Sequence, residues 1–162
     1  MLADLVGGNG FIAAFAAGLT FGIFVKGHCR FVYEFTESEG LMWVWGSFLF
    51  IGLTLLPNAI QHLDLRTVIY ILGSLFIVRP LAIYLSLLGT KTKLITRLFF
   101  GWFGPRGLAT ALFALIVTKN LRLDQAEAVL TVAINAVWIS ALLHGLSANA
   151  AAKWYGARIK AA

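Results

Sequence analysis

Charge is scarce in this chain, and acidic charge is the scarcest. Only 12% of the 162 residues are charged, and 13 Lys and Arg outnumber seven Asp and Glu, which gives a net charge of +6. In contrast, 60% of the residues are hydrophobic and the mean hydropathy is +0.86. This composition is typical of membrane proteins rather than of soluble globular domains. The basic residues lie in short connections between apolar runs and form no stripe, which argues against nucleic acid as a partner and indicates membrane topology.

Cysteine and clustered metal ligands are also scarce. The single cysteine, Cys29, excludes an intramolecular disulfide. Cys29 and its neighbour His28 have no further ligands at a useful spacing, so we expect a structural loop there and no metal site. The sequence contains no paired acid and base and no nucleophile–base spacing, so we predict no enzyme activity and no cofactor. No basic region precedes the first apolar run, so we expect no cleaved signal peptide.

Five apolar runs separated by short polar connections dominate the chain. About 20 apolar residues, with a range of roughly 17–25, suffice for a helix to cross the hydrocarbon core of a bilayer. The sequence therefore predicts an all-α polytopic membrane helix bundle with five transmembrane helices, one of them discontinuous. The expected spans are about 6–25, 41–57, 67–88, 98–118 and 128–146.

The first two spans have features of helix packing and of membrane anchoring, not of chemistry. Small residues recur every four positions in the first span, which favours close approach of a neighbouring helix: Gly10, Ala14, Gly18 and Gly22. The second span begins with Trp43 and Trp45, as expected for an aromatic belt at the membrane surface. Between these spans we expect a polar break over 26–40 with a short interfacial helix whose glutamates face solvent.

The fourth apolar run, 99–118, is both interrupted and charged. Three glycines and a proline break it, with an arginine among them: Gly101, Gly104, Pro105, Arg106 and Gly107. Non-helical backbone and charge at membrane depth must both face protein or a water-filled cavity. Discontinuous helices of this kind recur in secondary transporters. The alternative is a simple kink with Arg106 extended to the membrane surface.

The third span contains a second arginine, Arg79, near its middle and directly before Pro80. Pro80 removes one backbone hydrogen bond and loosens the helix beside it. Arg79 lies too deep for easy extension to the surface, which favours an ion pair over an exposed side chain. Yet the five spans contain no Asp or Glu that could pair with Arg79 or Arg106. We therefore expect the counter-charges on another chain or on a further N-terminal portion.

The fifth span carries two notable polar residues. We expect Asn135 to hydrogen-bond to a neighbouring helix, His144 to lie at the membrane edge, and Ser140 to be a small packing position. Five spans place the termini on opposite sides. Eight basic residues fall on one side and three on the other, which predicts an outside N-terminus and a cytoplasmic C-terminus. The eight are Lys26, Arg30, Lys91, Lys93, Arg97, Lys153, Arg158 and Lys160, and the three are Arg66, Lys119 and Arg122.

The sequence resembles the cation:proton antiporter superfamily, specifically the sodium/proton exchanger branch with the bacterial NhaP-type antiporters. Four collinear stretches carry the resemblance, and a closing span that ends LLHGLSA also fits. They are GGNGFIAAFAAGLTFG (7–22), EFTESEGLMWVWGSFLFIG (34–52), VRPLAIYLSLLGTK (78–91) and FFGWFGPRGLATALFALIV (99–117). The segment GWFGPRGLA is specific, and the ordered set covers nearly the whole chain.

The resemblance implies that residues 1–162 are the C-terminal part of an antiporter transmembrane domain built from two inverted repeats. By the same resemblance, Arg79 pairs with an acid on the cation-site helix. The Gly-Pro-Arg-Gly motif at Gly104, Pro105, Arg106 and Gly107 then forms the broken helix of the second half. The acidic pair that binds cation and proton in the family lies in the first half, and nothing in this sequence replaces it.

We therefore expect part of a monovalent cation/proton antiporter, with sodium as the cation, in the bacterial inner membrane. The implied partners are monovalent cations, protons, membrane lipid and the acid-bearing N-terminal half, and the family implies a homodimer. The alternative is a small non-transporting membrane subunit, or a truncated remnant, that needs a partner chain to supply the acids.

Overall fold

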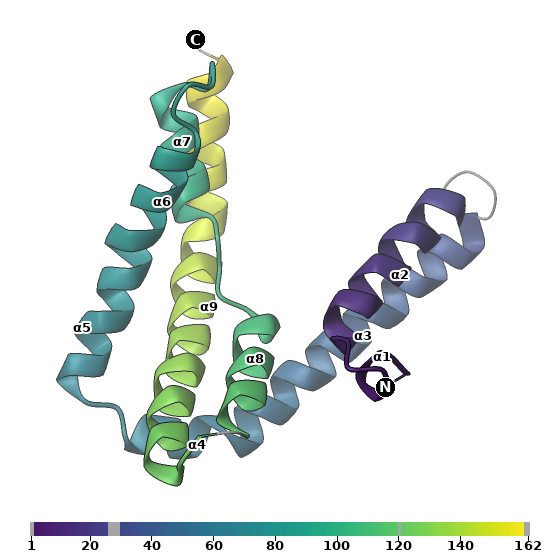
Figure 1. Ribbon diagram of the computed structural model, residues 1–162. Helices are drawn as coiled ribbons and strands as arrows, with labels where there is room; N and C mark the ends of the chain where they lie inside the picture. Colours follow the sequence, from purple (N-terminus) through teal and green to yellow (C-terminus); the bar gives the residue numbers. More distant parts are fainter. Residues whose placement is uncertain (1, 26–29, 120, 161–162) are drawn as a thin grey trace. The chain divides into compact units, whose positions relative to one another are not determined.

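Helices make up most of the computed structural model, which describes residues 2–25, 30–119 and 121–160 (Figure 1). No strand occurs in these residues. The chain divides into two compact units, Met1–Gly46 and Ser47–Ala162. The expected loop at His28 and Cys29 lies outside the described residues.

The first unit contains α1 (Leu2–Leu5), α2 (Gly10–Val25) and the first part of α3 (Arg30–Thr54). Gly7 ends α1 with a φ of +76°, and the Gly8 amide donates to the Ala3 carbonyl, as in a Schellman motif. The Asn9 side chain caps α2 by accepting hydrogen bonds from the two amides that follow Gly10, at 2.9 and 3.2 Å. The small residues Gly18 and Gly22 have open space beside them, so their packing against another helix stays a prediction.

The polar break expected over 26–40 is wrong for its described part. α3 runs without interruption from Arg30 through the glutamates and into the second apolar run. Its first turn gains an ion pair four residues apart, between Arg30 and Glu34 at 2.6 Å. Gly40 alone costs the helix only about 1 kcal/mol, and the segment contains no proline to end it. The glutamates of this segment therefore lie on a helix that continues into the second apolar run and ends at Thr54.

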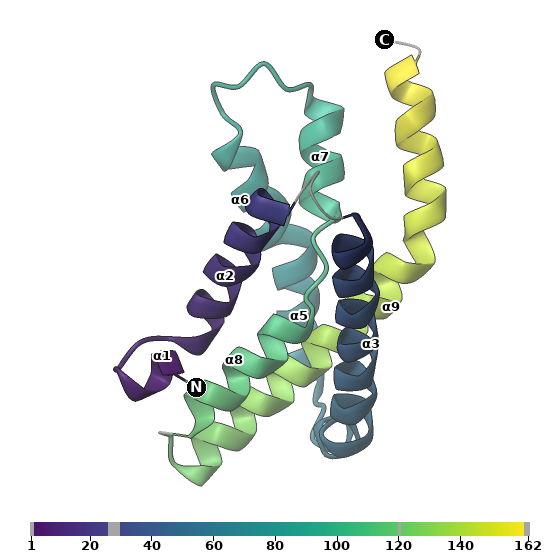
Figure 2. The same ribbon diagram turned by 90° about the vertical axis from the view of Figure 1, so that its right-hand side faces the viewer.

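The second unit is organised around one long helix, α9 (Leu123–Lys160), against which four shorter helices pack. Figures 1 and 2 show α8 running alongside the first half of α9. The others that contact α9 are α4, α5 and α7. In chain order the six helices between α3 and α9 are α4 (Leu56–Gln61), α5 (Leu65–Gly73), η1 (Ser74–Val78), α6 (Arg79–Ser86), α7 (Leu94–Trp102) and α8 (Leu108–Thr118).

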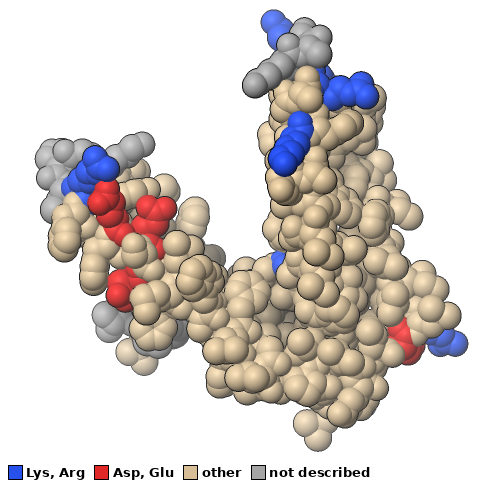
Figure 3. Space-filling model, turned by 180° about the vertical axis from the view of Figure 1, so that it is seen from behind, with Lys and Arg blue, Asp and Glu red and all other residues tan. Residues whose placement is uncertain are grey.

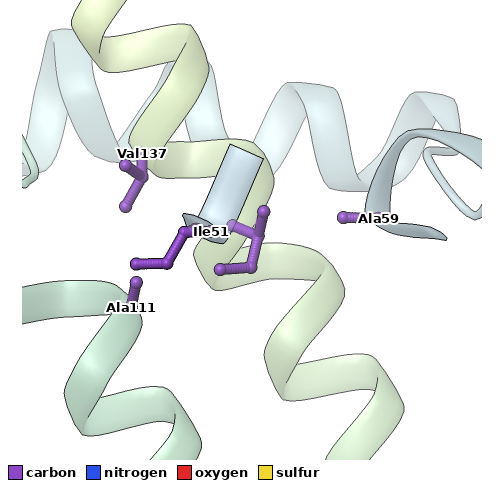
Figure 4. Packing of buried hydrophobic residues seen from close by; sticks show 5 residues of the cluster. Ile51, Ala59, Ala111 and Val137 are labelled. Carbon is purple, nitrogen blue, oxygen red and sulfur yellow. The ribbon is translucent and has the colours of Figure 1, made fainter. Parts of the chain in front are cut away.

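Two hydrophobic clusters join α4, α5, η1 and α8 to α9. The first joins the end of α3, α4, α8 and α9, and Figure 4 shows its side chains converging. It consists of Ile51, Ala59, Ala111, Ile134 and Val137. The second joins α5 and η1 to α9 through Ile71, Leu75 and Ala136. Small residues on α4, α8 and α9 let the backbones approach closely, as in membrane helix bundles.

Two helices in the described residues are long and apolar enough to cross a bilayer. One is Leu65–Ser86, formed by α5, η1 and α6, and the other is Leu123–Ile159 within α9. Gly10–Val25 and Leu108–Thr118 are apolar but shorter. α9 extends beyond the expected span of 128–146 in both directions, because it begins at Leu123 and ends at Lys160. Its 38 residues extend about 57 Å, well beyond the hydrocarbon core of about 30 Å.

Candidate functional site: a helix break with two arginines

The helix break lies between α7 and α8, at the place that the glycines and the proline predict. α7 ends at Trp102, and Phe103 has φ −79° and ψ 74°, the conformation of an inverse γ-turn. The Gly104 amide closes this turn by donating to the Trp102 carbonyl oxygen at 2.9 Å. Gly104 does not continue the helix because the following Pro105 disfavours the α conformation. Gly107 is extended, with φ −127° and ψ −159°, and immediately precedes α8.

The guanidinium group of Arg79 lies directly on Gly104. A Cβ atom at position 104 would overlap the Nη2, Nε and Cζ atoms of Arg79, so only glycine leaves room for this contact. One turn earlier, a Cβ atom at Gly101 would come within 3.0 Å of the Pro80 Cα atom. The two glycines therefore let α7 and the break approach the start of α6.

The helix that carries Arg79 widens just before it. Residues Ser74–Val78 form a π-helical turn, and the Arg79 amide donates to the Ser74 carbonyl five residues back. Pro80 explains this widening, because it lacks an N–H and its ring would clash with the Phe76 carbonyl of a regular α-helix. Such π-turns often occur at functional sites. Here the turn places Ser74 opposite the break.

Arg106 is held at both its backbone and its side chain. Its backbone amide donates to Ser140 Oγ on α9 at 2.9 Å, and its Nη2 donates to Ser74 Oγ on η1. The amide of a residue before α8 would otherwise be left without a partner at membrane depth, where lipid offers no hydrogen bonds. Arg106 therefore connects the break to two other helices and is half-buried rather than extended to the surface.

His144 on α9 holds the other end of the break. Only 5% of it is exposed, and its Nε2 lies 2.7 Å from the carbonyl oxygen of Trp102, the last residue of α7. The imidazole stacks on the Trp102 ring, with 4.8 Å between centroids, and the Trp102 indole donates to Ser147 Oγ at 3.0 Å. Ser140 and His144 are four residues apart, so one face of α9 receives both ends of the unwound segment.

The two arginines have no acidic partner in the described part of the chain. Its three ion pairs are Arg30–Glu34, His62–Glu127 and Arg122–Asp124. Arg79 Nε is buried and has no hydrogen-bond partner. Figure 3 shows the charged side chains of the second unit gathered mainly at its two ends, with uncharged surface between them. A buried ion-pair partner left without its opposite charge costs several kcal/mol, so the unsatisfied Arg79 Nε is the most conspicuous electrostatic feature of the break.

The site residues expected from the sequence differ in what they contact. Arg79 and Gly104 meet, and Arg106 lies beside them on the same broken segment. Pro105 is exposed, and Gly107 has open space beside it, so both act mainly on the backbone of the break.

Three polar residues of the site were not predicted from the sequence. Ser74 was not considered, Ser140 was expected to be a small packing position, and His144 was expected at the membrane edge. The position of His144 relative to the membrane stays a prediction, but its burial against the end of α7 was not foreseen. The four-residue spacing of Ser140 and His144 on one apolar span was the available signal. In contrast, the expectation for Asn135 is confirmed, because its amide donates to the Ala59 carbonyl on α4 at 2.6 Å.

Discontinuous helices of this kind are typical of secondary transporters, and the comparisons with known proteins point to the same class. The family model of the sodium/hydrogen exchanger transmembrane domain matches residues 1–154, so the chain belongs to this family of monovalent cation:proton antiporters. No solved structure matches the chain significantly.

Three curated relatives illustrate the similarity. The K(+)/H(+) antiporter NhaP of Alkalimonas amylolytica is 32% identical over 152 residues, which cover 91% of this chain and 25% of that protein. The K(+)/H(+) antiporter NhaP2 of Shewanella sp. (strain ANA-3) is 30% identical over 152 residues, 91% of this chain and 26% of the relative. The Na(+)/H(+) antiporter 1 of Methanocaldococcus jannaschii is 28% identical over 88 residues, which cover 54% of this chain and 21% of that protein. The chain thus spans about a quarter of the length of these relatives.

Proposed function

We propose that this chain is the C-terminal part of an inner-membrane antiporter that exchanges a monovalent cation for protons. Sodium is the first candidate cation. It crosses the membrane five times, ends in the cytoplasm, and completes one half of an inverted-repeat fold. The relatives are named as potassium/proton and sodium/proton antiporters, so potassium is the second candidate cation. The chain itself carries out no enzymatic reaction.

The observation that supports this proposal most is that two half-buried arginines, which have no acidic partner among the described residues, lie at the helix break. A carboxylate site that alternates between cation and proton needs nearby positive charge to balance it when it is empty. Arg79, lying on Gly104 with an unsatisfied Nε, offers that charge at the break. The carboxyl end of α7 and the amino end of α8 add partial charges of opposite sign.

In this proposal the five residues of the predicted site have three roles. Arg79 forms an ion pair with an acid outside residues 1–162 and so anchors the core. Arg106 fixes the unwound segment to η1 and α9. Gly104, Pro105 and Gly107 keep the backbone open, and Gly104 alone leaves room for the Arg79 guanidinium.

The experiment measures antiport in everted membrane vesicles from cells that lack their own sodium and potassium antiporters. The vesicles contain the native polypeptide that carries this sequence, and a fluorescent base reports the pH gradient. Adding sodium or potassium should dissipate the gradient, and Arg79→Gln should slow this by at least about tenfold, since breaking a buried pair costs about 3–5 kcal/mol. The matched control is Arg122→Gln, which removes an exposed pair at the other end of the unit. Equal antiport by both variants at equal expression would refute the role of Arg79.

A second candidate function follows from the same observation, that Arg79 and Arg106 have no acidic partner among the described residues. The chain would then be a small membrane subunit that transports nothing alone and associates with a partner that supplies the carboxylates. Purification in mild detergent distinguishes the two, because this alternative requires an acid-bearing membrane protein to co-purify at a fixed ratio. A single polypeptide that performs antiport without a partner would exclude it.

A further inference from the structure

One end of the second unit carries positive charge without negative charge. Its basic residues belong to the loop between α6 and α7, to the start of α7 and to the last turns of α9: Lys91, Lys93, Arg97, Lys153 and Arg158. The three acids in the sequence of this unit line one pocket at the opposite end: Asp64, Asp124 and Glu127. Figure 3 shows blue and no red side chains at the basic end in that view. No acid of the same unit therefore neutralises the charge there.

The loop between α6 and α7 directly follows a helix that is long enough to span a bilayer. Leu65–Ser86 has 22 residues, which extend about 33 Å, close to the thickness of about 30 Å of the hydrocarbon core. When this helix crosses the membrane as proposed above, residues 87–93 lie in the headgroup layer, beside the lipid phosphates. The inference below rests on that part of the proposed function and not on transport.

A chain of hydrogen bonds fixes this loop to Arg97. The Thr90 hydroxyl donates to the Leu87 carbonyl oxygen at 2.8 Å, so in its 2.6 Å contact with Thr92 the donor is the Thr92 hydroxyl. Thr92 Oγ1 accepts from Arg97 Nε at 3.1 Å, and Arg97 Nη2 donates to the Thr90 carbonyl oxygen at 3.0 Å. Hydrogen bonds in such a chain strengthen one another, so the loop and the guanidinium group hold each other in place.

The guanidinium group of Arg97 keeps donors for a further partner. Its Nη1 makes no hydrogen bond in the described residues and is not buried, and Arg97 belongs to none of their ion pairs. Its Cζ atom lies 5.7 Å from the centroid of the Tyr84 ring on α6. A guanidinium with a fixed position and free N–H groups is well suited to bind phosphate oxygens. Lys91 and Lys93, both exposed, add two further cations on the same loop.

An exposed apolar stripe runs along α6 up to this loop. Its residues are spaced three and four apart, so they share one face of α6 and of the turn after it: Leu81, Tyr84, Leu85 and Leu88. Between 37% and 54% of each residue is exposed. Since Arg97 lies over the Tyr84 ring, the stripe and the basic loop form one continuous surface.

We propose that this surface binds an anionic phospholipid. Arg97 holds the lipid phosphate through its free Nη1, Lys91 and Lys93 add attraction to the negative headgroup, and an acyl chain lies along the stripe. Basic side chains at the surface of a bilayer select anionic lipids in this way. The site therefore prefers phosphatidylglycerol, which carries a net negative charge, over zwitterionic phosphatidylcholine. Because α6 begins at Arg79 and α7 ends at the break, the bound lipid stabilises the two helices that frame the candidate site.

Photolabelling in vesicles of defined composition tests this proposal. The native polypeptide that carries this sequence is placed in phosphatidylcholine with either photoactivatable phosphatidylglycerol or an equal amount of photoactivatable phosphatidylcholine. Each probe has its reactive group in the acyl chain, and peptide mass spectrometry locates the label after illumination. We expect phosphatidylglycerol to label residues 81–88 at least about fivefold more than phosphatidylcholine does, the size expected for one basic residue at an anionic headgroup.

Two variants and two matched controls test the cause of the preference. Lys91→Gln removes an exposed charge and no hydrogen bond of the loop, and it should lower the preference for phosphatidylglycerol about fivefold. Arg97→Gln should lower it at least as much. Lys119→Gln and Arg122→Gln remove the same charges at the opposite end of the unit and should leave the labelling of residues 81–88 unchanged. Labelling by phosphatidylcholine shows in each variant whether α6 still faces lipid.

Three results would overturn the lipid site. The first is equal labelling of residues 81–88 by the two lipids, or a preference that Lys91→Gln leaves unchanged. The second is absence of label from either lipid, because protein then covers this face of α6. The third is displacement of phosphatidylglycerol by inorganic phosphate, which would indicate a site for soluble anions. Antiport is measured in the same vesicles, and its absence would count against the proposed function and not against the lipid site.

Discussion

A methyl group added at Gly104 is expected to damage the site far more than one added at Gly107, three residues away. In Gly104→Ala the new Cβ would overlap the guanidinium of Arg79, so Arg79 or the break must shift. Overpacking of this kind typically costs about 1–3 kcal/mol. At Gly107 nothing lies within 4 Å of the added Cβ, and its φ of −127° is ordinary for alanine. Gly107→Ala should therefore be neutral or stabilise by about 0.4–1 kcal/mol.

Reversible unfolding in mixed micelles, followed by tryptophan fluorescence, measures the two free energies of unfolding. The combination of Gly104→Ala with Arg79→Ala tests the cause, because removing the guanidinium should relieve the overlap. The double variant should then lose less stability than the sum of the two single variants, by about 0.5–3 kcal/mol. If Gly104→Ala stays within about 0.5 kcal/mol of Gly107→Ala, the contact between Arg79 and Gly104 does not exist in the membrane.

Two further predictions concern the frame around the site. Asn135→Ala should destabilise the fold by about 1–3 kcal/mol, because the buried Ala59 carbonyl and the Trp138 indole N–H both lose their hydrogen bond to Asn135. The control is Asn149→Ala, because Asn149 is exposed on the same helix. Equal free energies of unfolding for the two variants would contradict the role of these hydrogen bonds. Hydrogen bonds from the Thr67 side chain and amide hold the pKa of Asp64 below its ordinary value of 3.8. The stability that this cap of α5 adds is therefore full above pH 3.8 and is lost as the pH falls through the lowered pKa. Asp64→Asn should keep the cap and remove this pH dependence from Thr67 amide exchange, and an unchanged pH profile would refute the assignment.

The helix break was predictable because its cause is local. Pro105 and the neighbouring glycines disfavour a helix wherever they occur, so their position in the sequence fixes the position of the break. The effect of Pro80 was predictable for the same reason, and it appears as the π-turn at Ser74–Val78. The hydrogen bond of Asn135 followed from the need of any buried amide for a partner.

The contacts across the site could not be predicted in the same way. The contact between Arg79 and Gly104 depends on how two helices pack, which no local pattern records. The burial of His144 depends in the same way on the packing of α7 against α9, which continues to Lys160. The polar break predicted over 26–40 is wrong for a related reason. Its glutamates suggest a membrane boundary, but no residue in the described part of this segment ends a helix, and α3 continues through it.

The central claim is that acids outside residues 1–162 complete the site around Arg79 and Arg106. Its most direct test is the mass of the native protein, purified from source membranes in mild detergent with an antibody against the basic end of α9. The account predicts a polypeptide more than twice the 17.7 kDa of this chain, or a 17.7 kDa chain with an acid-bearing membrane partner at a fixed ratio. A 17.7 kDa chain that purifies alone and still exchanges sodium or potassium for protons would contradict it.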